Sequence, residues 1–314
     1  VGDAIVFPGV FVGIRKTMTA LATSILDHEM VVTPEVATVR REVAAARARG
    51  ETVGVVPTMG ALHDGHLSLV TTACEECDFV VATIFVNPTQ FGPQEDLDRY
   101  PRPREHDLDL CKRRGVNLVF EPAASTVYPD DFSTFVEVAG LSDILEGKFR
   151  PGHFRGVSTV VLKLLNIVQP DVAFFGRKDY QQQTLVRRMC TDLELPVEIR
   201  ICPTVREADG LALSSRNRYL SPSDREKALS LSQSLMLAKR RLAAGETDVV
   251  AVRHAMLEHL ASVSGVEVDY ATVADAVTLD ELIAPRTEMV ALVAAHVGGT
   301  RLIDNLPISQ PAEF

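Results

Sequence analysis

Short apolar runs alternate with amphipathic stretches along most of the chain. Runs rich in β-branched residues predict buried strands over residues 30–33, 52–57, 79–86, 116–120, 171–175 and 197–202. Between them, apolar residues spaced three and four apart predict helices over residues 34–49, 66–77, 104–114, 154–168 and 179–191. Strands that alternate with helices are typical of βαβ units. We therefore predict an α/β fold with a Rossmann-like parallel sheet.

The pattern changes near Pro203. Two long helical patterns follow, over residues 222–244 and 248–263, and then alternating runs over residues 266–273 and 289–297 predict strands. Helices followed by strands indicate a second, smaller α+β domain. The predicted organisation is an N-terminal extension over residues 1–29, a Rossmann-like domain over 30–204, and a C-terminal α+β domain over 205–314 that closes over it. Functional residues on both sides of this boundary predict a site in the cleft between the domains.

Charge narrows the classes of function. The chain of 314 residues has 42 acidic and 32 basic side chains and a formal net charge of −10. Such a surface lacks the broad basic field that holds a nucleic-acid backbone, so we expect no nucleic-acid partner. Every apolar run is shorter than the roughly 18 residues needed to cross a bilayer, so we expect no membrane span.

Cysteine usage favours a cytoplasmic protein. Five cysteines are scattered over a long chain, and an odd, scattered number does not make a disulfide framework. The first apolar stretch precedes its positive pair, Arg15 and Lys16, which is the wrong order for a secretory signal. Cys74 and Cys77 form one CxxC in a predicted helix, but no second Cys/His pair has a suitable spacing for zinc. We therefore favour two helix-face thiols over a metal site.

The first chemical motif follows the strand that ends at Pro57. The letters TMGALHDGH lead from this strand into a helix, and Gly60 and Gly65 let the backbone bend and approach a ligand closely. The start of the helix offers unpaired N–H groups and a partial positive charge, which attract phosphate. His63 and His66 can both act as donors into this loop. The segment therefore favours a polyphosphate site.

Other interpretations of this loop are weaker. Gly60 and Gly65 have the spacing of a P-loop, but His66 and Leu67 stand where that motif needs Lys and Ser or Thr. The two glycines alone also fit an ordinary tight turn with surface histidines. The two histidines can be metal ligands only with a third, which is not evident nearby.

Neutral amides follow the next predicted strand. Asn87 and Gln90 stand where ligands gather in a parallel sheet, at the carboxyl end of a strand. Amides recognise hydroxyls and carboxylates by geometry, without neutralising their charge. A loop capped by its own amides is the alternative interpretation.

Charged residues follow a later strand in the same way. Gly176 ends the strand, Lys178 can serve as a mobile cation for phosphate, and Asp179 can accept from ribose hydroxyls. The alternative is an N-cap Asp beside a solvated Lys.

The last motif lies at the predicted domain junction. Ser214, Ser215 and Arg216 place two hydroxyls and a guanidinium together, which makes a compact anion clamp suited to a triphosphate. Taken alone, the same letters also fit a commonplace turn.

The four segments together resemble one known family. His-x-Gly-His after a strand resembles the HIGH signature of the nucleotidyltransferase superfamily, and the strings PTMGALHDGH, FVNPTQF, FFGRKDYQQ and PTVREADGLALSSRNRYL resemble the pantothenate synthetase family. This resemblance implies ATP-dependent condensation of (R)-pantoate with β-alanine. It implies a pantoyl-adenylate intermediate, with release of pyrophosphate and AMP. Activation must come first, because a carboxylate is a poor acyl donor.

The resemblance also implies roles for individual residues. The implied catalytic residues are His63, His66, Lys178 and Arg216. The implied ATP-binding residues are Pro57, Thr58, Met59, Gly60, His63, Gly65, His66, Gly176, Lys178, Asp179, Val205, Leu213, Ser214, Ser215 and Arg216. Those implied for pantoate are Met59, Gln90 and Gln182, and those for β-alanine are Asn87, Gln90 and Tyr100. Thr89 and Leu213 stand where the family often has Met.

Mg²⁺ is expected to arrive with ATP and to be held mainly by the phosphates. Where acidic residues are linked to Mg²⁺ in some relatives, this chain has Glu105, His106 and Asp107, of which only Asp107 matches. We therefore assign no protein ligand to the metal. A homodimer is expected from the family and from the general prevalence of symmetric dimers.

Two other functions share some of these motifs. A nucleotidylyltransferase would need the histidines and the Ser-Ser-Arg clamp, but would want cations where this chain has Gln90 and Gln182. A non-catalytic nucleotide-binding module would tolerate the same fold. Pyrophosphate release that depends on pantoate distinguishes the ligase from both.

Overall fold

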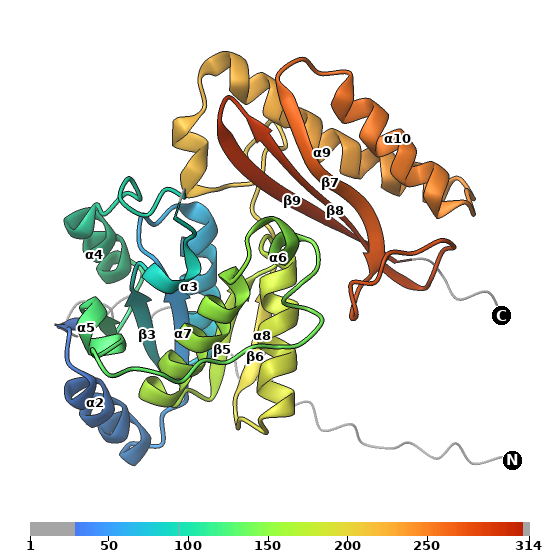
Figure 1. Cartoon of the computed structure of the whole chain (residues 1–314). Coiled ribbons are helices and arrows are strands. Elements are labelled where there is room, and N and C mark those ends of the chain that lie inside the picture. Colours follow the sequence, from blue (N-terminus) through green and yellow to red (C-terminus); the bar gives the residue numbers. More distant parts are fainter. Residues whose placement is uncertain (1–28, 94, 310–314) are drawn as a thin grey trace, which may run out of the picture.

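A computed structural model describes residues 29–93 and 95–309 of the chain (Figure 1). The apolar stretch before Arg15 and all but the last residue of the predicted extension lie outside the described residues. Six strands form one sheet in the order β1-β4-β3-β2-β5-β6, and each neighbouring pair is parallel. The strands are β1 (Val31–Thr33), β2 (Val53–Thr58), β3 (Phe79–Ile84), β4 (Leu118–Phe120), β5 (Val172–Gly176) and β6 (Glu198–Cys202). The predicted parallel sheet is confirmed.

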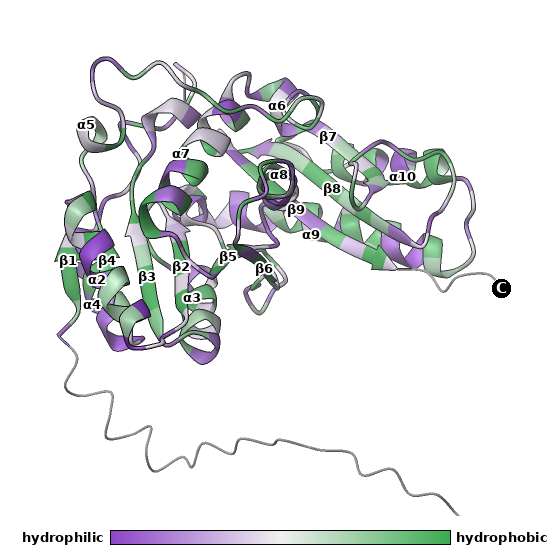
Figure 2. Ribbon diagram, turned by 90° about the horizontal axis from the view of Figure 1, so that it is seen from below, coloured by the Kyte–Doolittle hydropathy of each residue, from purple (hydrophilic) through white to green (hydrophobic). Residues whose placement is uncertain are grey.

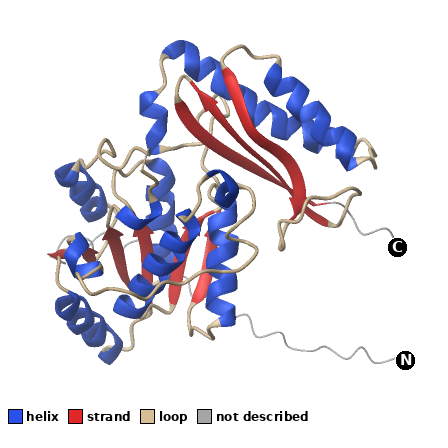
Figure 3. Ribbon diagram, in the orientation of Figure 1, coloured by secondary structure: helices blue, strands red, loops and turns tan. Residues whose placement is uncertain are grey.

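Helices cover both faces of this sheet (Figure 3). The helices of this part of the chain are α2 (Val36–Ala48), α3 (Asp64–Glu76), α4 (Arg104–Arg113), α5 (Ala124–Val127), α6 (Glu146–Phe149), α7 (His153–Val168) and α8 (Tyr180–Asp192). On β2, Val55 packs in the cluster that includes α2, α7 and α8, whereas Val56 packs in the cluster that includes α3. Because successive side chains of a strand point to opposite faces, both faces of β2 must be apolar. Figure 2 accordingly shows the central strands as mostly hydrophobic.

The C-terminal part contains a second sheet with two helices packed on it. Strands β7 (Val266–Asp275), β8 (Glu288–Val297) and β9 (Thr300–Ser309) are antiparallel in that order. Helices α9 (Pro222–Ala243) and α10 (Val249–Ala261) share an apolar cluster with them. The predicted α+β character is therefore confirmed. The boundary between residues 204 and 205 stays a prediction; β6 ends at Cys202.

Strand β9 was not predicted from the sequence pattern. Its polar residues Asp304 and Asn305 interrupt the apolar alternation, although they are 5% and 2% exposed. Gly298 and Gly299 form the two-residue turn that connects β8 to β9, with φ of 56° and 77°. Positive φ at both positions matches the turns that suit antiparallel hairpins. This glycine pair was the available signal for the missed strand.

The CxxC thiols lie in and next to α3. Burial raises the pKa of both Cys74 and Cys77 to about 11, so neither is a thiolate near pH 7. Within the described ranges, no group of three or more His, Cys, Asp or Glu side chains is arranged to hold a metal ion. No described helix combines the length and apolar character needed to span a bilayer.

Candidate active site

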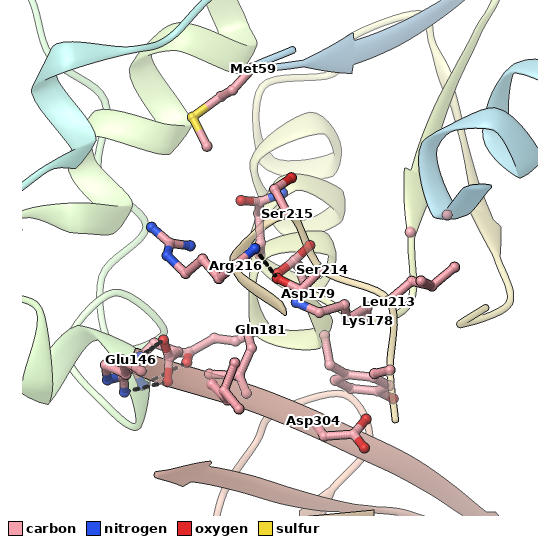
Figure 4. Close-up of a pocket in the computed structure, with 18 of the residues that line it drawn as sticks. Met59, Glu146, Lys178, Asp179, Gln181, Leu213, Ser214, Ser215, Arg216 and Asp304 are labelled. Atoms are coloured by element: carbon pink, nitrogen blue, oxygen red, sulfur yellow. Dashed lines mark hydrogen bonds and ion pairs between the residues drawn. The ribbon is translucent and has the colours of Figure 1, made fainter. Parts of the chain in front are cut away.

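A cavity of about 810 Å³ lies where the carboxyl ends of β2, β3 and β5 face the β8–β9 hairpin (Figure 4). Its wall includes residues of both sheets and of the segment that connects them. All the candidate site residues named from the sequence line this cavity, except Gly60. The structure thus brings together motifs that lie up to about 160 positions apart along the chain.

A distant carboxylate holds the turn after β2. Gly60 and Ala61 have φ of 78° and 49°, so the chain bends sharply there. Asp107 of α4 is 1% exposed and accepts from the N–H groups of Ala61 and Leu62, at 2.8 Å each. Gly60 faces this carboxylate, since a Cβ added to it would lie 3.0 Å from Asp107 Oδ2. Gly60 is thus part of the turn, and both oxygens of Asp107 are used in holding it.

The two histidine rings of the loop lie close together, and both have lowered pKa values. His63 Nδ1 accepts from the N–H of Gly65 at 3.1 Å, which leaves its proton on Nε2 as a donor. The ring centroids of His63 and His66 are 4.1 Å apart. Burial and the charge of Lys178 lower the pKa of His63 to about 4, and burial and His63 lower the pKa of His66 to about 3. Near pH 7 both rings can donate hydrogen bonds without carrying a positive charge.

Lys178 and Asp179 stand at the start of α8. Asp179 occupies the N-cap position, yet its side chain makes no capping hydrogen bond. Its carboxylate lies 3.6 Å from Lys178 Nζ instead. Burial opposes ionisation of Asp179, but Lys178, His66 and Arg216 together hold its pKa below the usual value. A carboxylate that does not cap its helix remains available to a ribose hydroxyl.

The Ser-Ser-Arg segment contacts both neighbouring loops. Ser214 caps a 3₁₀ turn, η2 (Ser215–Tyr219), by accepting from the N–H of Arg216 at 3.3 Å. The Ser215 hydroxyl donates to the Ala61 carbonyl at 3.3 Å. Arg216 donates to both carboxylate oxygens of Asp96, at 3.1 and 2.8 Å. This segment therefore lies against the histidine loop on one side and an acidic loop on the other.

Strand β9 joins the C-terminal sheet to the rest of the site. Arg301 donates to both oxygens of Glu146 in α6, at 2.6 and 2.8 Å, and the Glu146 side chain is 7% exposed. Asn305 Nδ2 donates to the carbonyls of Arg177 and Lys178, at 3.0 and 2.7 Å. The backbone around Lys178 is thus fixed from across the cavity.

Neutral amides form another part of the wall. Gln90 Nε2 lies 3.1 Å from Met59 Sδ. The Gln182 side chain lines the cavity and makes no hydrogen bond within the part of the chain that the structure describes. Gln181 lines it too, but its amide donates to two backbone carbonyls and accepts from the N–H of Glu146. Of the two adjacent glutamines, Gln182 is the one available to a ligand.

The remaining predicted residues line the cavity, and two of them are almost fully buried. Tyr100 is 6% exposed and packs edge-on against Phe91, with ring centroids 6.0 Å apart. Asn87 is 1% exposed, and its amide bonds to other parts of the protein. Val205 and Leu213 line the cavity and are joined by a backbone hydrogen bond of 3.0 Å.

An ion-paired cluster in the wall has no role predicted from the sequence. Arg150 donates to both oxygens of Glu95, at 2.8 and 2.5 Å, and also contacts His153 Nε2 at 3.1 Å. Because a guanidinium only donates, His153 Nε2 accepts and Nδ1–H donates to the carbonyl of Gln90 at 2.9 Å. Burial and Arg150 lower the pKa of His153 to about 4. The string RPGHFRG was the signal for this cluster, which supports the backbone of Gln90.

Comparisons with known proteins agree with this geometry. The model of the family described as Pantoate-beta-alanine ligase matches residues 31–307. The chain is 52% identical over 271 residues to the pantothenate synthetase of Moorella thermoacetica, covering 86% of this chain and 96% of that protein. It is 56% identical over 275 residues to the pantothenate synthetase of a Nocardioides species, covering 84% of this chain and 81% of that protein.

Solved structures give the same result. The crystal structure of the pantothenate synthetase from Thermus thermophilus superposes with a TM-score of 0.83 at 47% identity, covering 88% of this chain and 99% of that one. The crystal structure of the pantoate-beta-alanine ligase from Francisella tularensis superposes with a TM-score of 0.70 at 32% identity, covering 88% of this chain and 97% of that one. The chain described here belongs to the pantoate-beta-alanine ligase family.

Proposed function

We propose that the chain condenses (R)-pantoate with β-alanine in two half-reactions within this one cavity. ATP first adenylates the pantoate carboxylate, and the amine of β-alanine then displaces AMP. The Francisella tularensis relative is described as complexed with beta-gamma ATP and beta-alanine, which supports binding of both compounds here. The chain is a ligase, as its family membership shows.

In the first half-reaction a carboxylate oxygen of pantoate attacks the α-phosphorus of ATP. The bond from this phosphorus to the bridging oxygen breaks, and pyrophosphate leaves. We assign the phosphates to Lys178, Arg216 and the two serines, because these cationic and hydroxyl groups gather in one part of the cavity wall. His63 and His66 act as neutral donors to the phosphate oxygens. Their lowered pKa values argue against a full proton transfer from the unliganded site.

In the second half-reaction the β-alanine amine attacks the carbonyl carbon of the acyl adenylate. The C–O bond to AMP breaks, and the amine loses a proton as the amide forms. Gln90 and Gln182 hold the pantoyl group throughout, because their neutral amides suit its hydroxyls and carbonyl. Tyr100 lines the same cavity, and we assign it to the path by which β-alanine enters.

Mg²⁺ would enter bound to the triphosphate, where it would neutralise charge on the phosphate oxygens. Asp107, the acidic residue that matches the family pattern, is committed to the N–H groups of Ala61 and Leu62. Its position therefore does not fit direct metal binding.

One observation carries this proposal. Groups suited to phosphate and neutral amides suited to a hydroxy acid occupy the wall of one cavity. Pyrophosphate release should require ATP and pantoate alone, and AMP release should further require β-alanine. Pyrophosphate release that needs a phosphate ester in place of pantoate would indicate a nucleotidylyltransferase instead, and ATP binding without turnover would indicate a binding module.

We also propose a homodimer, which rests on the prevalence of symmetric dimers among soluble proteins. Light scattering coupled to size exclusion should give about twice the chain mass of 34.3 kDa. A mass of one chain at micromolar concentration would contradict it.

A further inference from the structure

A hydrogen-bond chain runs from the backbone of α7 to the amide of Gln90. It begins at the Gly156 carbonyl, which lies 3.2 Å from the Asn87 side-chain amide. A carbonyl can only accept, so the atom of Asn87 that faces it must be Nδ2. Gly156 permits this approach, since a Cβ there would lie 2.4 Å from the carbonyl oxygen of Thr89. The backbone of α7 thus fixes the orientation of the Asn87 amide.

Two hydroxyls hold the other end of the Asn87 amide. Its Oδ1 accepts from Tyr128 Oη at 2.9 Å and from Thr89 Oγ1 at 3.0 Å. Nδ2 donates to Gly156 and also to Gln90 Oε1, at 3.1 Å. Both lone pairs and both N–H groups are therefore used, and only 1% of Asn87 is exposed. Asn87 has no hydrogen-bonding capacity left for a substrate.

The orientation passes on to Gln90. Because Asn87 presents an N–H group, the atom of Gln90 that faces it must be Oε1. Gln90 Nε2 consequently points the other way, toward Met59 Sδ at 3.1 Å, in the cavity wall. A flipped Gln90 would place two N–H groups against each other and would turn its oxygen toward the acid.

We propose that Asn87, Tyr128 and Thr89 are positioning residues that make Gln90 present an N–H donor to pantoate. The donor suits a substrate oxygen, either of the carboxylate or of a hydroxyl, whereas an amide oxygen would repel a carboxylate. The inference rests on the proposed function, in which Gln90 binds pantoate. It gives Asn87 a task other than the β-alanine contact expected from the sequence. Thr89, which stands where the family often has Met, supplies one of the two hydroxyls.

The test removes both hydroxyls while keeping side-chain shape. Tyr128→Phe with Thr89→Val leaves Asn87 Oδ1 unsatisfied, so that the contacts of Nδ2 with Gly156 and Gln90 alone oppose a turn of the amide. We expect the KM for pantoate in the first half-reaction, measured as pyrophosphate release without β-alanine, to rise about tenfold, while the KM for ATP stays within about twofold. Each single variant retains one donor and should show a smaller rise. If the double variant does not fold, the KM for pantoate can still be measured with Tyr128→Phe alone.

Thr159→Val is the matched control. Thr159 is on α7, three residues from Gly156, and its hydroxyl bonds to the Arg155 carbonyl and the Val136 N–H, away from the cavity. It should leave the KM for pantoate unchanged even if stability falls. An equal rise in this control would show that the effect is structural and would overturn the inference.

Asn87→Asp separates the two possible tasks of Asn87. An oxygen in place of Nδ2 faces the Gly156 carbonyl and Gln90 Oε1, so pantoate-dependent pyrophosphate release should fall more than in the double variant. The KM for β-alanine, measured with isolated pantoyl adenylate, should stay near the wild-type value. A rise in that KM with pantoate use intact would overturn the inference. Failure of the wild-type chain to release pyrophosphate with pantoate would refute the proposed function itself.

Discussion

Asp107→Asn isolates the contribution of one buried carboxylate to the histidine loop. The carboxylate accepts two backbone N–H groups at 2.8 Å, from Ala61 and Leu62. An amide keeps one acceptor but turns its NH₂ toward the other N–H donor. The loss of one charge-assisted bond and the burial of unsatisfied donors should lower the free energy of unfolding by about 2–4 kcal/mol.

The same change should slow adenylation. The loop carries His63 and His66, and a displacement of reacting groups by about 1 Å can cost on the order of 100-fold in rate. Rapid-quench measurement of the first half-reaction gives this rate, and urea denaturation gives the stability. Aminolysis of isolated pantoyl adenylate should change less, because no pyrophosphate leaves in that half-reaction.

Asp109→Asn provides the control on the same helix. Asp109 is exposed and pairs with Arg113 at 2.6 Å, so its loss should cost at most about 0.5 kcal/mol and leave adenylation unchanged. The reasoning fails if Asp107→Asn loses stability as expected yet adenylates pantoate at the wild-type rate. In that case the geometry of the loop would not depend on this carboxylate.

Three further predictions concern the site directly. His66→Ala should reduce adenylation by about 100-fold or more with a smaller effect on aminolysis of isolated adenylate, and equal losses in the two half-reactions would contradict its role. Gln182→Ala should raise the KM for pantoate, through the loss of roughly 1–3 kcal/mol of binding free energy, while ATP affinity is kept. Lys178→Ala should slow adenylation while pantoate binding is kept. Titrations in which the Gln182 variant loses ATP and the Lys178 variant loses pantoate would exchange these roles. The pKa of His153 is lowered to about 4 in the folded chain, so the unfolded chain binds more protons between pH 6.5 and 4. The free energy of unfolding should therefore fall as the pH falls through this window, by up to about 1.4 kcal/mol per pH unit for each such histidine. His153→Gln keeps an acceptor and a donor but does not titrate, so urea denaturation at pH 7, 6 and 5 should show a shallower dependence, and an unchanged slope would refute this.

Much of the site was predictable because its determinants are local. Each segment has a buried strand, a loop with a small residue or an amide, and often a helix start, and these features are visible in consecutive letters. Topology then brings the segments together, because parallel strands present their carboxyl ends at one edge of the sheet. His63, Gln90 and Lys178 come from three such segments and line one cavity.

The parts that were missed depend on contacts between distant residues. Asp107 accepts a hydrogen bond from a backbone N–H group 46 positions away, and the residues around it resemble those at the start of any helix. Gln181 and Gln182 are adjacent in the sequence, and only packing shows that Gln181 is consumed by backbone groups. The amide of Asn87 is likewise committed by a glycine 69 positions away. No pattern of apolar and polar letters contains these pairings.

The contacts of β9 bear on how cooperatively the chain unfolds. Separating the two sheets would break the ion pair between Arg301 and Glu146, whose side chains are 18% and 7% exposed. It would also remove the Asn305 donor from the carbonyls beside Lys178. The parallel sheet and the β7–β9 sheet should therefore melt in one calorimetric transition, in which neither sheet persists as an independent folding unit.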